Sequence, residues 1–587
     1  MNKKSNRLLA ALLIILMLLS ACGNNTGTTG ASTSASAVQD GTDKAAAASS
    51  GAASPAGTDK GANAQAGTEL VTPAGTLPIV TQPYTVKIGL QKYGQVVDYI
   101  NNNYTKYIQD NTGITLDIEV FPQAEANQKM EVLIASSSTL PDAFMGGDFY
   151  GSQNRQTTVY RHAQNGVFIQ LDELIEKYGT NMKAMSEKVV NKNFMNLLRS
   201  PDGHFYALPN YNEQTSNEYS LRACINKTWL DKLNLPMPKT TEDLYNVLKA
   251  FKTQDPNGNG QVDEIGVMGG GGWHQLAADF LMNAFIYDDG ETRWNIKDGK
   301  LDVPYNKEGW REGLRYLNRL CEEGLFDPLS FTQDQASYKA IATAGDRNSI
   351  GVVVMAGMGQ IFAASMADRK SEYVPLDPLS GPSGICWAAR YPVVPNPGTV
   401  ITKDCANPEV VMRMADFMMS EESSVFSRFG KPETDWTKPA SGDVALGAKW
   451  GATPAIKPIL VWGGTAHSSH WNDVGPHILL QKYTDGQAWN GNPTDAEYMI
   501  AQCVPGLLHK EPAEVATLIL YDKEQTAQIA DIQTTLTSYV KETLARFATG
   551  DMDLEKDWDG YLKELDRIGL AKYIEVSQSA YDKMMKK

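Results

Sequence analysis

The apolar residues between positions 85 and 145 follow patterns that predict strands and helices in regular alternation. Residues 85–90 are an apolar-rich run that predicts a strand, and residues 114–121 alternate apolar with polar side chains, as half-buried strands do. Residues 96–109 and 124–136 predict helices. The short apolar run 143–145 completes the order strand, helix, strand, helix, strand, which implies a parallel sheet with helical crossovers. Ligands of such sheets bind beyond the carboxyl ends of the strands.

Similar patterns continue in the middle of the chain. Apolar residues recur at helical spacing over residues 244–251, and Thr240 or Thr241 is the expected N-cap of that helix. Residues 306–324 predict another helix, and the apolar run 349–355 predicts a buried strand. The folded part of about 500 residues is too long for one hydrophobic core. We therefore expect at least two α/β lobes.

The N-terminus has the layout of an export signal. A basic segment precedes an apolar core over residues 8–19, which is too short to span a membrane comfortably. The core ends in Leu19-Ser20-Ala21-Cys22, which resembles the lipobox of bacterial lipoproteins. That resemblance implies that residues 1–21 are a signal peptide and that Cys22 becomes the mature N-terminus, with diacylglycerol on its sulfur. A secretory signal with an incidental cysteine is the alternative.

Residues 22–82 are rich in Ala, Gly, Ser and Thr and contain few large apolar side chains. Such a segment cannot bury enough surface to offset the entropy lost on ordering, so it predicts a flexible tether. A lipid anchor followed by this tether would hold the folded part at the outer face of the cell membrane. No later stretch of the sequence approaches the length of a transmembrane helix.

The charge and the cysteines exclude several classes of protein. Lys plus Arg total 53 against 68 Asp plus Glu, a formal net charge of -15, which argues against a nucleic-acid partner. The cysteines after Cys22 are widely and irregularly spaced, so they form no disulfide framework or zinc module. We expect most of them to be small buried apolar side chains, although one bridge is compatible with an extracellular protein. They are Cys224, Cys321, Cys386, Cys405 and Cys503.

Residues 255–264, DPNGNGQVDE, alternate oxygen-bearing side chains around glycine, as calcium-binding loops do. An EF-hand closes its shell with a bidentate glutamate at the last loop position, but Gly266 occupies that position here. Two neighbouring carboxylates would have to replace it. The ligands of Ca²⁺ would then be Asp255, Asn257, Asn259, the Gln261 carbonyl, Asp263 and Glu264. An Asx-rich turn without a metal is the alternative.

The tryptophans suggest a carbohydrate ligand, because sugar rings present CH faces that pack on aromatic planes. Core packing is nevertheless the commoner role of any single tryptophan. Four tryptophans lie in polar, glycine-rich or histidine-rich surroundings and are the candidates for ligand contact: Trp273, Trp462, Trp471 and Trp489. The four glycines 269–272 before Trp273 lack the lysine of a phosphate-binding loop and predict a permissive loop with an exposed aromatic side chain.

Several phrases, in this order, resemble the extracellular solute-binding proteins of ABC importers, especially their long lipoprotein subfamily. They are ASSSTLPDAF, DGHFYALP, INKTWLDKL, PKTTEDLYNVLKAF, DPNGNGQVDEIG, YNKEGWREGLRYLNRLCEEGLFDP, VITKDCANPEVVMRMADFMMSEE and FATGDMDLEKDWDGYLKELDRIGL. The resemblance covers nearly all of the folded chain. It implies a periplasmic-binding-protein-like α/β fold, in which a hinge joins two lobes around a ligand cleft. It also implies a structural calcium ion in residues 255–264, as in close relatives that bind acidic oligosaccharides such as alginate.

The expected division assigns residues 83–222 and about 375–421 to the first lobe, and residues 223–374 and about 422–587 to the second. The expected function is that of a lipid-anchored monomer that captures an oligosaccharide and delivers it to the membrane subunits of an ABC permease. The sequence contains no GxSxG, HExxH or phosphate-loop motif, so we do not expect an enzyme. A glycoside hydrolase needs only two carboxylates, so a surface hydrolase or lyase acting on polysaccharide is one alternative. A binding protein that serves a sensor is another.

Overall fold

The computed structural model describes residues 70–151, 155–462 and 464–585. Cys22, the predicted signal peptide and most of the predicted tether therefore lie outside the described residues. Everything described belongs to one contact unit that begins at Thr68. None of the helices in the described ranges combines the length and the apolar composition needed to cross a membrane.

The first sheet has six strands, in the order β14-β4-β11-β3-β1-β2. β1 is parallel to both β2 and β3, β14 is parallel to β4, and β11 is antiparallel to its neighbours β3 and β4. All strands except β11 therefore run in one direction, and their carboxyl ends share one edge. The strands are β1 (Tyr84–Lys92), β2 (Ile114–Pro122), β3 (Ala143–Met145), β4 (Leu208–Asn212), β11 (Asn396–Ile401) and β14 (His477–Leu479).

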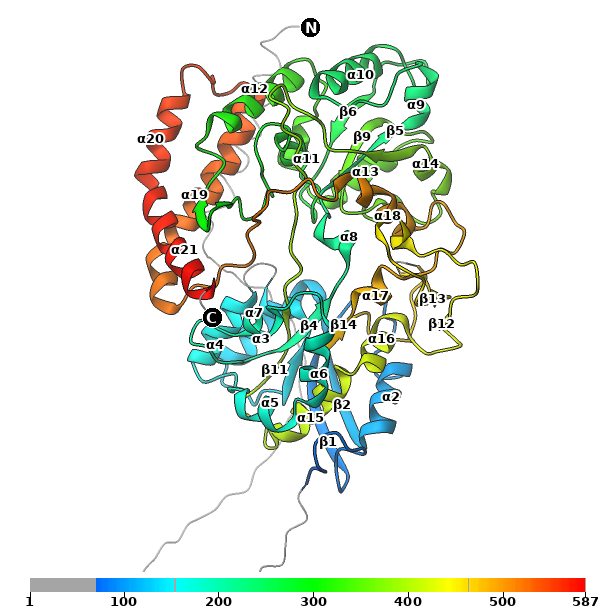
Figure 1. Cartoon of the computed structure of the whole chain (residues 1–587), viewed down its shortest axis with the longest axis vertical. Helices are drawn as coiled ribbons and strands as arrows, with labels where there is room; N and C mark the ends of the chain where they lie inside the picture. The colour runs from blue at the N-terminus through cyan, green and yellow to red at the C-terminus, as the bar shows by residue number, and fades with distance from the viewer. Residues whose placement is uncertain (1–69, 152–154, 463, 586–587) are drawn as a thin grey trace, which may run out of the picture. The chain divides into compact units, whose positions relative to one another are not determined.

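The helices of the first lobe bury apolar residues against this sheet in two neighbouring clusters. They are α2 (Asn103–Thr112), α3 (Ala126–Ala135), α4 (Arg155–Gln164), α5 (Asp172–Tyr178), α6 (Thr180–Lys188), α7 (Phe194–Leu198), α15 (Pro408–Met418) and α16 (Glu421–Phe429). α15 and α16 come from the part of the chain after β11, so the first lobe is assembled from distant segments (Figure 1).

The second sheet has four strands, in the order β10-β5-β9-β6. They are β5 (Arg222–Asn226), β6 (Ile265–Met268), β9 (Ile350–Met355) and β10 (Tyr373–Leu376). β6 is parallel to β9, whereas β5 is antiparallel to both β9 and β10. The carboxyl ends of β6, β9 and β10 therefore lie at the same edge as the amino end of β5.

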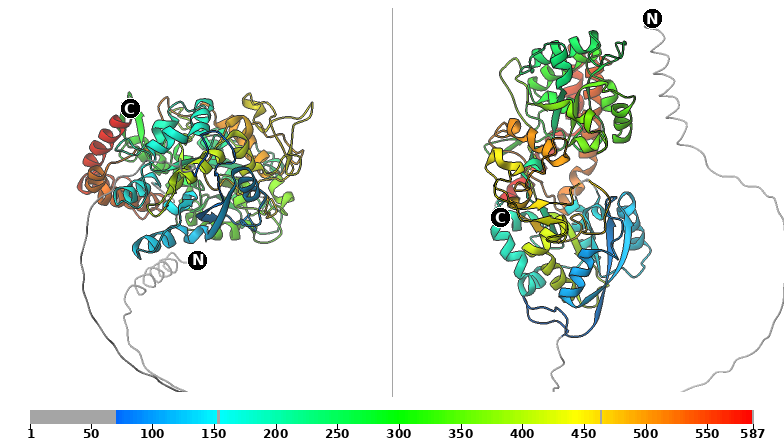
Figure 2. Two further views of the ribbon diagram at one scale, coloured as in Figure 1. Left: turned by 90° about the horizontal axis from the view of Figure 1, so that it is seen from below. Right: turned by 90° about the vertical axis from the view of Figure 1, so that its right-hand side faces the viewer.

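The helices of the second lobe pack on this sheet and on one another. Among them α12, α19, α20 and α21 lie side by side (Figures 1 and 2). Their apolar faces are buried together with the sheet in one large cluster. The helices are α9 (Lys227–Lys232), α10 (Thr241–Thr253), α11 (Ala277–Met282), α12 (Glu308–Glu322), α13 (Gln335–Thr343), α14 (Ala367–Ser371), α18 (Ala496–Leu507), α19 (Lys523–Thr549), α20 (Trp558–Ile568) and α21 (Leu570–Met585).

Short elements complete the fold. Two small antiparallel pairs join β7 (Asn295–Lys297) to β8 (Lys300–Asp302), and β12 (Trp436–Thr437) to β13 (Lys457–Pro458). The chain passes from one sheet to the other after β4, through α8 (Thr215–Glu218), and again between β10 and β11. A further passage follows β14 and contains α17 (Gln481–Thr484) before α18. These passages are called the crossing segments below.

Most of the predicted elements are present. The predicted strands 85–90, 114–121 and 143–145 correspond to β1, β2 and β3, and the predicted strand 349–355 corresponds to β9. The predicted helices 124–136 and 306–324 correspond to α3 and α12. α10 begins after Thr240, whose side chain accepts from the Asp243 amide in a capping box, as predicted.

The helix predicted over residues 96–109 begins only at Asn103. Before it, Asp98 Oδ1 accepts from the amides of Ile100 (2.7 Å) and Asn101 (3.0 Å), and Asn102 caps the helix. Asx side chains that bind nearby amides favour turns over helix, and they delay the helix start here.

The predicted lobe boundary at residue 422 is wrong. β14 is a strand of the first sheet, and Phe426, Trp471 and Ile478 belong to the first-lobe core. The partner of β14 is β4, and its three residues are too few to display an alternating pattern. The chain returns to the second lobe at α18, where Cys503 and Leu507 pack with residues of β6 and β9.

Candidate functional site

A polar group of the first lobe lies at the carboxyl edge of the first sheet. It consists of Gln95, which follows β1, Arg428 at the end of α16, and Trp462, Asn472 and Asp473 in the loop before β14. This loop reaches the edge because Asn472 Nδ2 donates to Gln95 Oε1 (3.4 Å). We call these five residues the first-lobe group. Sheets of this type bind ligands at this edge.

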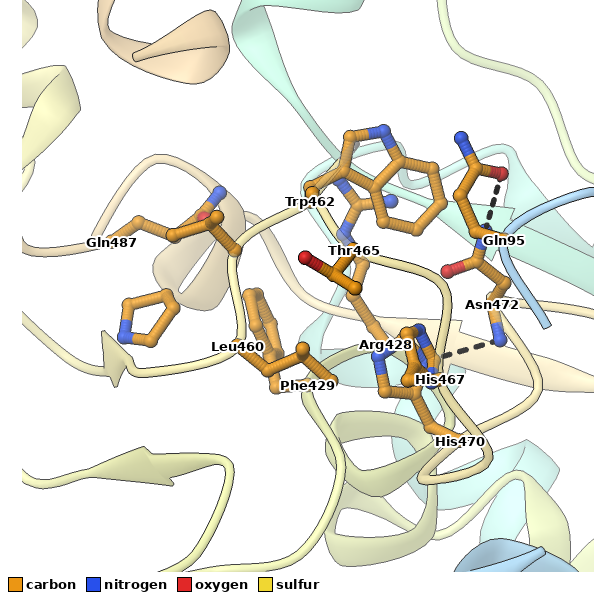
Figure 3. Close-up of a pocket in the computed structure, with 13 residues that line it drawn as sticks. Gln95, Arg428, Phe429, Leu460, Trp462, Thr465, His467, His470, Asn472 and Gln487 are labelled. Atoms are coloured by element: carbon orange, nitrogen blue, oxygen red, sulfur yellow. Dashed lines mark hydrogen bonds between the residues drawn. The ribbon is translucent and has the colours of Figure 1, made fainter. Parts of the chain in front are cut away.

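Arg428 is the centre of the first-lobe group. Its guanidinium is almost fully buried, and Nη1 donates to Asp473 Oδ2 at 2.6 Å. The Trp462 ring lies over the guanidinium, 3.8 Å from its carbon to the ring centroid, which is a cation–π arrangement (Figure 3). A small pocket lies beside these side chains and is also lined by Gln95 and Asn472. The half-buried Trp462 therefore lines a pocket, and its predicted contact with a ligand stays a prediction.

The loop that carries Asn472 and Asp473 holds a strained backbone. Both residues have left-handed φ angles, 59° and 63°, which non-glycine residues seldom adopt in succession. The buried Asp473 Oδ1 has no hydrogen-bond partner among the described residues. Backbone strain and an unmet buried acceptor concentrate at functional loops. Together they make this loop a candidate for part of a binding site.

His470 supports the strained loop in its neutral form. The side chain is buried, and its Nδ1 accepts from the Asn472 amide at 3.1 Å (Figure 3). Burial, followed by the charge of nearby His467, lowers the pKa of His470 to about 3. The imidazole therefore stays uncharged and remains an acceptor at neutral pH.

An aromatic platform lies at the carboxyl edge of the second sheet. Trp273 and His274 follow β6 after four glycines, and Tyr391 comes from the crossing segment between β10 and β11. The Tyr391 and His274 rings are 3.9 Å apart, and Trp273 lies 4.6 Å beyond His274, centroid to centroid. The Trp273 side chain is 54% exposed. We call these three residues the second-lobe platform.

Polar contacts hold the platform in place. The buried His274 lies between Ser220 Oγ, 2.5 Å from Nδ1, and Glu291 Oε1, 3.0 Å from Nε2. Gln360, in the turn η4 (Met358–Gln360) after β9, donates Nε2 to the Trp273 carbonyl at 3.0 Å. Gly269 is required here, since a Cβ would lie 2.2 Å from the Gln275 carbonyl oxygen. The loop thus presents an open indole face on a fixed base.

Crossing segments contribute contacts that link the two groups. Gln214, just after β4, donates Nε2 to Glu497 Oε2 (3.2 Å) at the start of α18. Glu497 Oε1 in turn lies 3.8 Å from the Arg428 guanidinium. Arg390, next to Tyr391, is paired with Glu218 of α8 at 2.9 Å. Residues of the crossing segments thus adjoin both the first-lobe group and the second-lobe platform.

Trp471 does not contact a ligand. Its side chain is fully buried in the first-lobe core, and the indole N–H donates to Thr105 Oγ1 at 2.8 Å. The prediction for this residue was wrong because its polar neighbours His470, Asn472 and Asp473 are themselves buried, so polar surroundings in the sequence did not mark an exposed ring. Trp489 is half-buried, stacks on Tyr498 at 4.5 Å, and donates its N–H to the Asn492 carbonyl. It lies outside both groups.

The predicted calcium loop forms a turn around the Asp255 carboxylate. Asp255 Oδ1 accepts from the amides of Gly258 and Asn259, and Oδ2 accepts from Gly260. The two glycines have left-handed φ angles of 71° and 81°, which the turn requires. Asn259 Nδ2 donates to both oxygens of Asp263, at 3.1 and 3.2 Å.

The oxygen set of this loop fits a hard cation. Glu264 is fully buried, and its Oε2 has no hydrogen-bond partner among the described residues. Burial raises the pKa of Glu264, and the charges of Asp255 and Asp263 act in the same direction. In the described part of the chain, no three His, Cys, Asp or Glu side chains are arranged to hold a metal. The amide oxygens of Asn257 and Asn259 and the Gln261 carbonyl would therefore have to complete a shell.

Several residues of the two groups carried no clear signal in the sequence. Arg428 and Tyr391 lie in segments that are otherwise typical of a helix end and a loop. Only the run from Asn472 to Gly475 has a composition that favours left-handed backbone. The contacts between these residues join segments that lie from tens to hundreds of positions apart, so local pattern could not reveal them.

Comparisons with known proteins agree with this architecture. The family model described as "Bacterial extracellular solute-binding protein" matches residues 93–424, just over half of the chain. The fructooligosaccharide ABC transporter substrate-binding protein FusA of Streptococcus pneumoniae is 29% identical over 492 residues, covering 81% of this chain and 86% of FusA.

Solved structures resemble the chain over most of its length. FusA in complex with kestose matches with a TM-score of 0.69 and 26% identity, covering 86% of this chain and 99% of that one. FusA has also been solved as an EF-hand mutant with fructo-nystose, with a TM-score of 0.68 and the same coverage. An extracellular solute-binding protein of Bifidobacterium longum subsp. infantis, 20% identical, matches with a TM-score of 0.69 over 86% of this chain and 98% of its own.

Proposed function

The chain belongs to the family of bacterial extracellular solute-binding proteins, and from that premise we propose that it captures an oligosaccharide for an ABC importer. The main support for this proposal is the exposed aromatic surface of the second-lobe platform. Trp273 offers an open indole face at the sheet edge where ligands bind, and its loop is fixed by Gln360 and His274. A sugar ring stacks on such a face through its CH groups. The similarity to FusA, a fructooligosaccharide-binding protein, supports the same ligand class.

The charges of the two groups favour a neutral oligosaccharide over an acidic one. Arg428 is paired with Asp473, and Arg390 is paired with Glu218. A guanidinium whose charge is already balanced has little left to offer a uronate carboxylate, and the chain as a whole is acidic. Hydroxyl groups, by contrast, can exchange hydrogen bonds with amides such as Gln95 and Asn472.

The same pairing speaks against hydrolysis at this site. A glycosidase needs one carboxylic acid that can donate a proton and a second carboxylate across the scissile bond. Asp473 accepts from Arg428, and Glu291 is in contact with His274. These carboxylates are engaged in holding the loops, which suits binding and not proton transfer.

Capture would follow from closure of the two lobes. A ligand that contacts both the first-lobe group and the second-lobe platform binds the closed form better than the open one. It raises the closed population by that difference in affinity. The crossing segments are the positions where the backbone would bend. The closed, loaded form would then dock on the membrane subunits of a permease.

Calorimetry with matched sugars tests this function. The titrants are kestose, a neutral fructooligosaccharide, and an oligogalacturonate of the same length. We expect the neutral sugar to bind with one-to-one stoichiometry and to be recovered intact by chromatography. We expect the acidic sugar to bind much more weakly. Failure of both sugars and of a wider neutral panel would refute the oligosaccharide assignment, and a shortened sugar would show an enzyme.

We also propose that Cys22 carries the lipid anchor and that the protein acts as a monomer. The support is the lipobox resemblance of residues 19–22 and a family that works outside the cell. Metabolic labelling with palmitate tests the anchor. We expect label in the natural chain and none in Cys22→Ser, which should be released into the medium. Equal labelling of both would contradict the assignment.

We further propose that residues 255–264 hold a structural Ca²⁺. Asp255, Asp263 and Glu264 would supply carboxylates, Asn257 and Asn259 amide oxygens, and Gln261 its carbonyl. The buried, unpartnered Glu264 Oε2 supports this, as does the EF-hand named for the FusA structure. The ion would supply positive charge that lets the buried Glu264 ionise, and would hold the loop between α10 and β6.

A further inference from the structure

Two buried cysteines meet where α18 packs on the second sheet. Cys224 lies in the middle of β5, and Cys503 lies in α18, 279 residues further along the chain. Their sulfur atoms are 3.8 Å apart. Both side chains belong to the same small hydrophobic cluster. Among the described residues, neither Cys321, Cys386 nor Cys405 makes a comparable contact with another sulfur.

A buried guanidinium lies close to this pair. Arg222 is 2% exposed, and its Nη atoms donate to the carbonyls of Ala356 and Ser216. Within the described ranges it forms no ion pair with a carboxylate, and its Nε has no hydrogen-bond partner. The charge of Glu497 acts on this guanidinium without an ion-pair contact. A buried cation that lacks a contacting counter-ion is costly, so an anion beside it would stabilise the fold.

The pKa values of the two thiols shift in opposite directions. The hydrogen bond from Cys224, followed by the charge of Arg222 against the opposing effect of burial, lowers the pKa of Cys503. Donating that hydrogen bond, together with burial, raises the pKa of Cys224. Cys503 is therefore the better thiolate and the better nucleophile of the pair.

We propose that Cys224 and Cys503 form a disulfide that fastens α18 to the second sheet. The Cys503 thiolate attacks one sulfur of an oxidised dithiol or oxidised glutathione and releases the first thiolate. Cys224 then loses its proton and attacks the Cys503 sulfur, which expels the second thiol. The two electrons leave with the external disulfide, which becomes two thiols. The pair is buried, so this exchange belongs to folding, and the extracellular setting of the family is oxidising.

The bridge would determine which end of α18 can move. The amino end of α18 carries Glu497, which contacts Gln214 and approaches Arg428 of the first-lobe group. The middle carries Cys503, next to β5. A bond at Cys503 makes α18 move with the second lobe, so closure bends the chain on the first-lobe side of Glu497. The bridge is thus expected to stabilise the fold without abolishing ligand binding.

Peptide mapping of the exported full chain tests the bridge directly. The protein is alkylated while denatured and then digested with trypsin, with and without prior reduction. Cleavage gives residues 223–227 and 483–510, each of which contains one cysteine. We expect these peptides to be linked before reduction and separate after it. If both are fully alkylated without reduction, even after the chain has been refolded in the presence of oxidised glutathione, the proposal fails.

Thermal melting supplies a second measurement with matched variants. A disulfide that closes so long a loop restricts the unfolded chain, so reductant should lower the melting temperature of the natural chain by roughly 5 °C. Cys503→Ser should melt at the temperature of the natural chain in reductant, and reductant should not change that temperature. Cys321→Ser, a partly buried cysteine without a sulfur neighbour, should respond to reductant as the natural chain does. A response to reductant that persists in Cys503→Ser would also overturn the proposal.

Discussion

Replacing Trp273 with alanine tests whether the second-lobe platform stacks on the ligand. The side chain is 54% exposed, and since a whole tryptophan presents about 250 Å², roughly 135 Å² is open to solvent. A sugar ring laid on one face would cover about half of that, or roughly 65 Å², which at about 25 cal/mol per Å² contributes about 1.6 kcal/mol. Because about 1.4 kcal/mol corresponds to a tenfold change in Kd, Trp273→Ala should weaken binding about 15-fold.

The assay is titration calorimetry with the tightest-binding neutral oligosaccharide, beginning with kestose. Trp273→Phe is the matched control, because it keeps an aromatic face in the same loop and should retain most of the affinity. Thermal melting of each variant should stay close to that of the natural chain, since substitutions at exposed positions alter stability by about 0.5 kcal/mol or less. An unchanged Kd in a folded Trp273→Ala variant would refute the stacking role. Equal weakening by phenylalanine would refute it as well.

The other predictions concern stability. A chelator should lower the melting temperature of the natural chain by several degrees and should not change that of Asp255→Ala. The control Asp298→Ala, in another left-handed turn, should stay sensitive to the chelator. If the chelator does not change the melting temperature of the natural chain, the calcium site is contradicted. Because the pKa of His470 is lowered in the folded chain, this side chain binds a proton in the unfolded chain at a higher pH than in the folded chain. Stability should therefore fall as pH drops from about 6.5 toward 3, at up to about 1.4 kcal/mol per pH unit for this one proton. His470→Gln should have a shallower dependence in urea unfolding, and an equal slope would contradict this. Trp471→Ala should cost about 3–5 kcal/mol in urea unfolding, and Trp471→Phe less, because the residue is core; a loss of affinity at unchanged stability would count against that role.

Local pattern was enough for much of the first lobe and for the turn at residues 255–264. β1, β2 and β3 were predicted because apolar side chains in strands follow the backbone pleat, and the parallel order follows from the helices between them. The loop at residues 255–264 was recognised for a related reason. Its turn is made by side chains and amides within ten residues, so spacing alone places the Asp255 carboxylate under the amides of Gly258 and Gly260. Trp273 was identified from its glycine-rich neighbours, which leave the ring exposed.

Local pattern was not enough where the environment comes from elsewhere in the chain. Trp471 and Trp462 lie in similar polar surroundings in the sequence, yet one is in the core and the other covers Arg428 beside a pocket. The difference depends on α2 and α16, which pack around Trp471. β14 joins the first sheet through backbone hydrogen bonds, which do not depend on the side chains. Its three residues are too few to show the alternation of apolar and polar positions by which a strand is predicted.

The sequence by itself therefore determined the family, the alternation of strands and helices, and the loops whose contacts are local. The tertiary structure alone decided which polar residues gather at the candidate binding edge. Arg428, Asp473 and Gln95 meet only when α16, β1 and the loop before β14 are brought together. It also decided that Cys224 faces Cys503 beside the buried guanidinium of Arg222. Hydrophobic periodicity encodes the direction in which a side chain points within its own element, whereas partners from distant segments are set by how the elements pack.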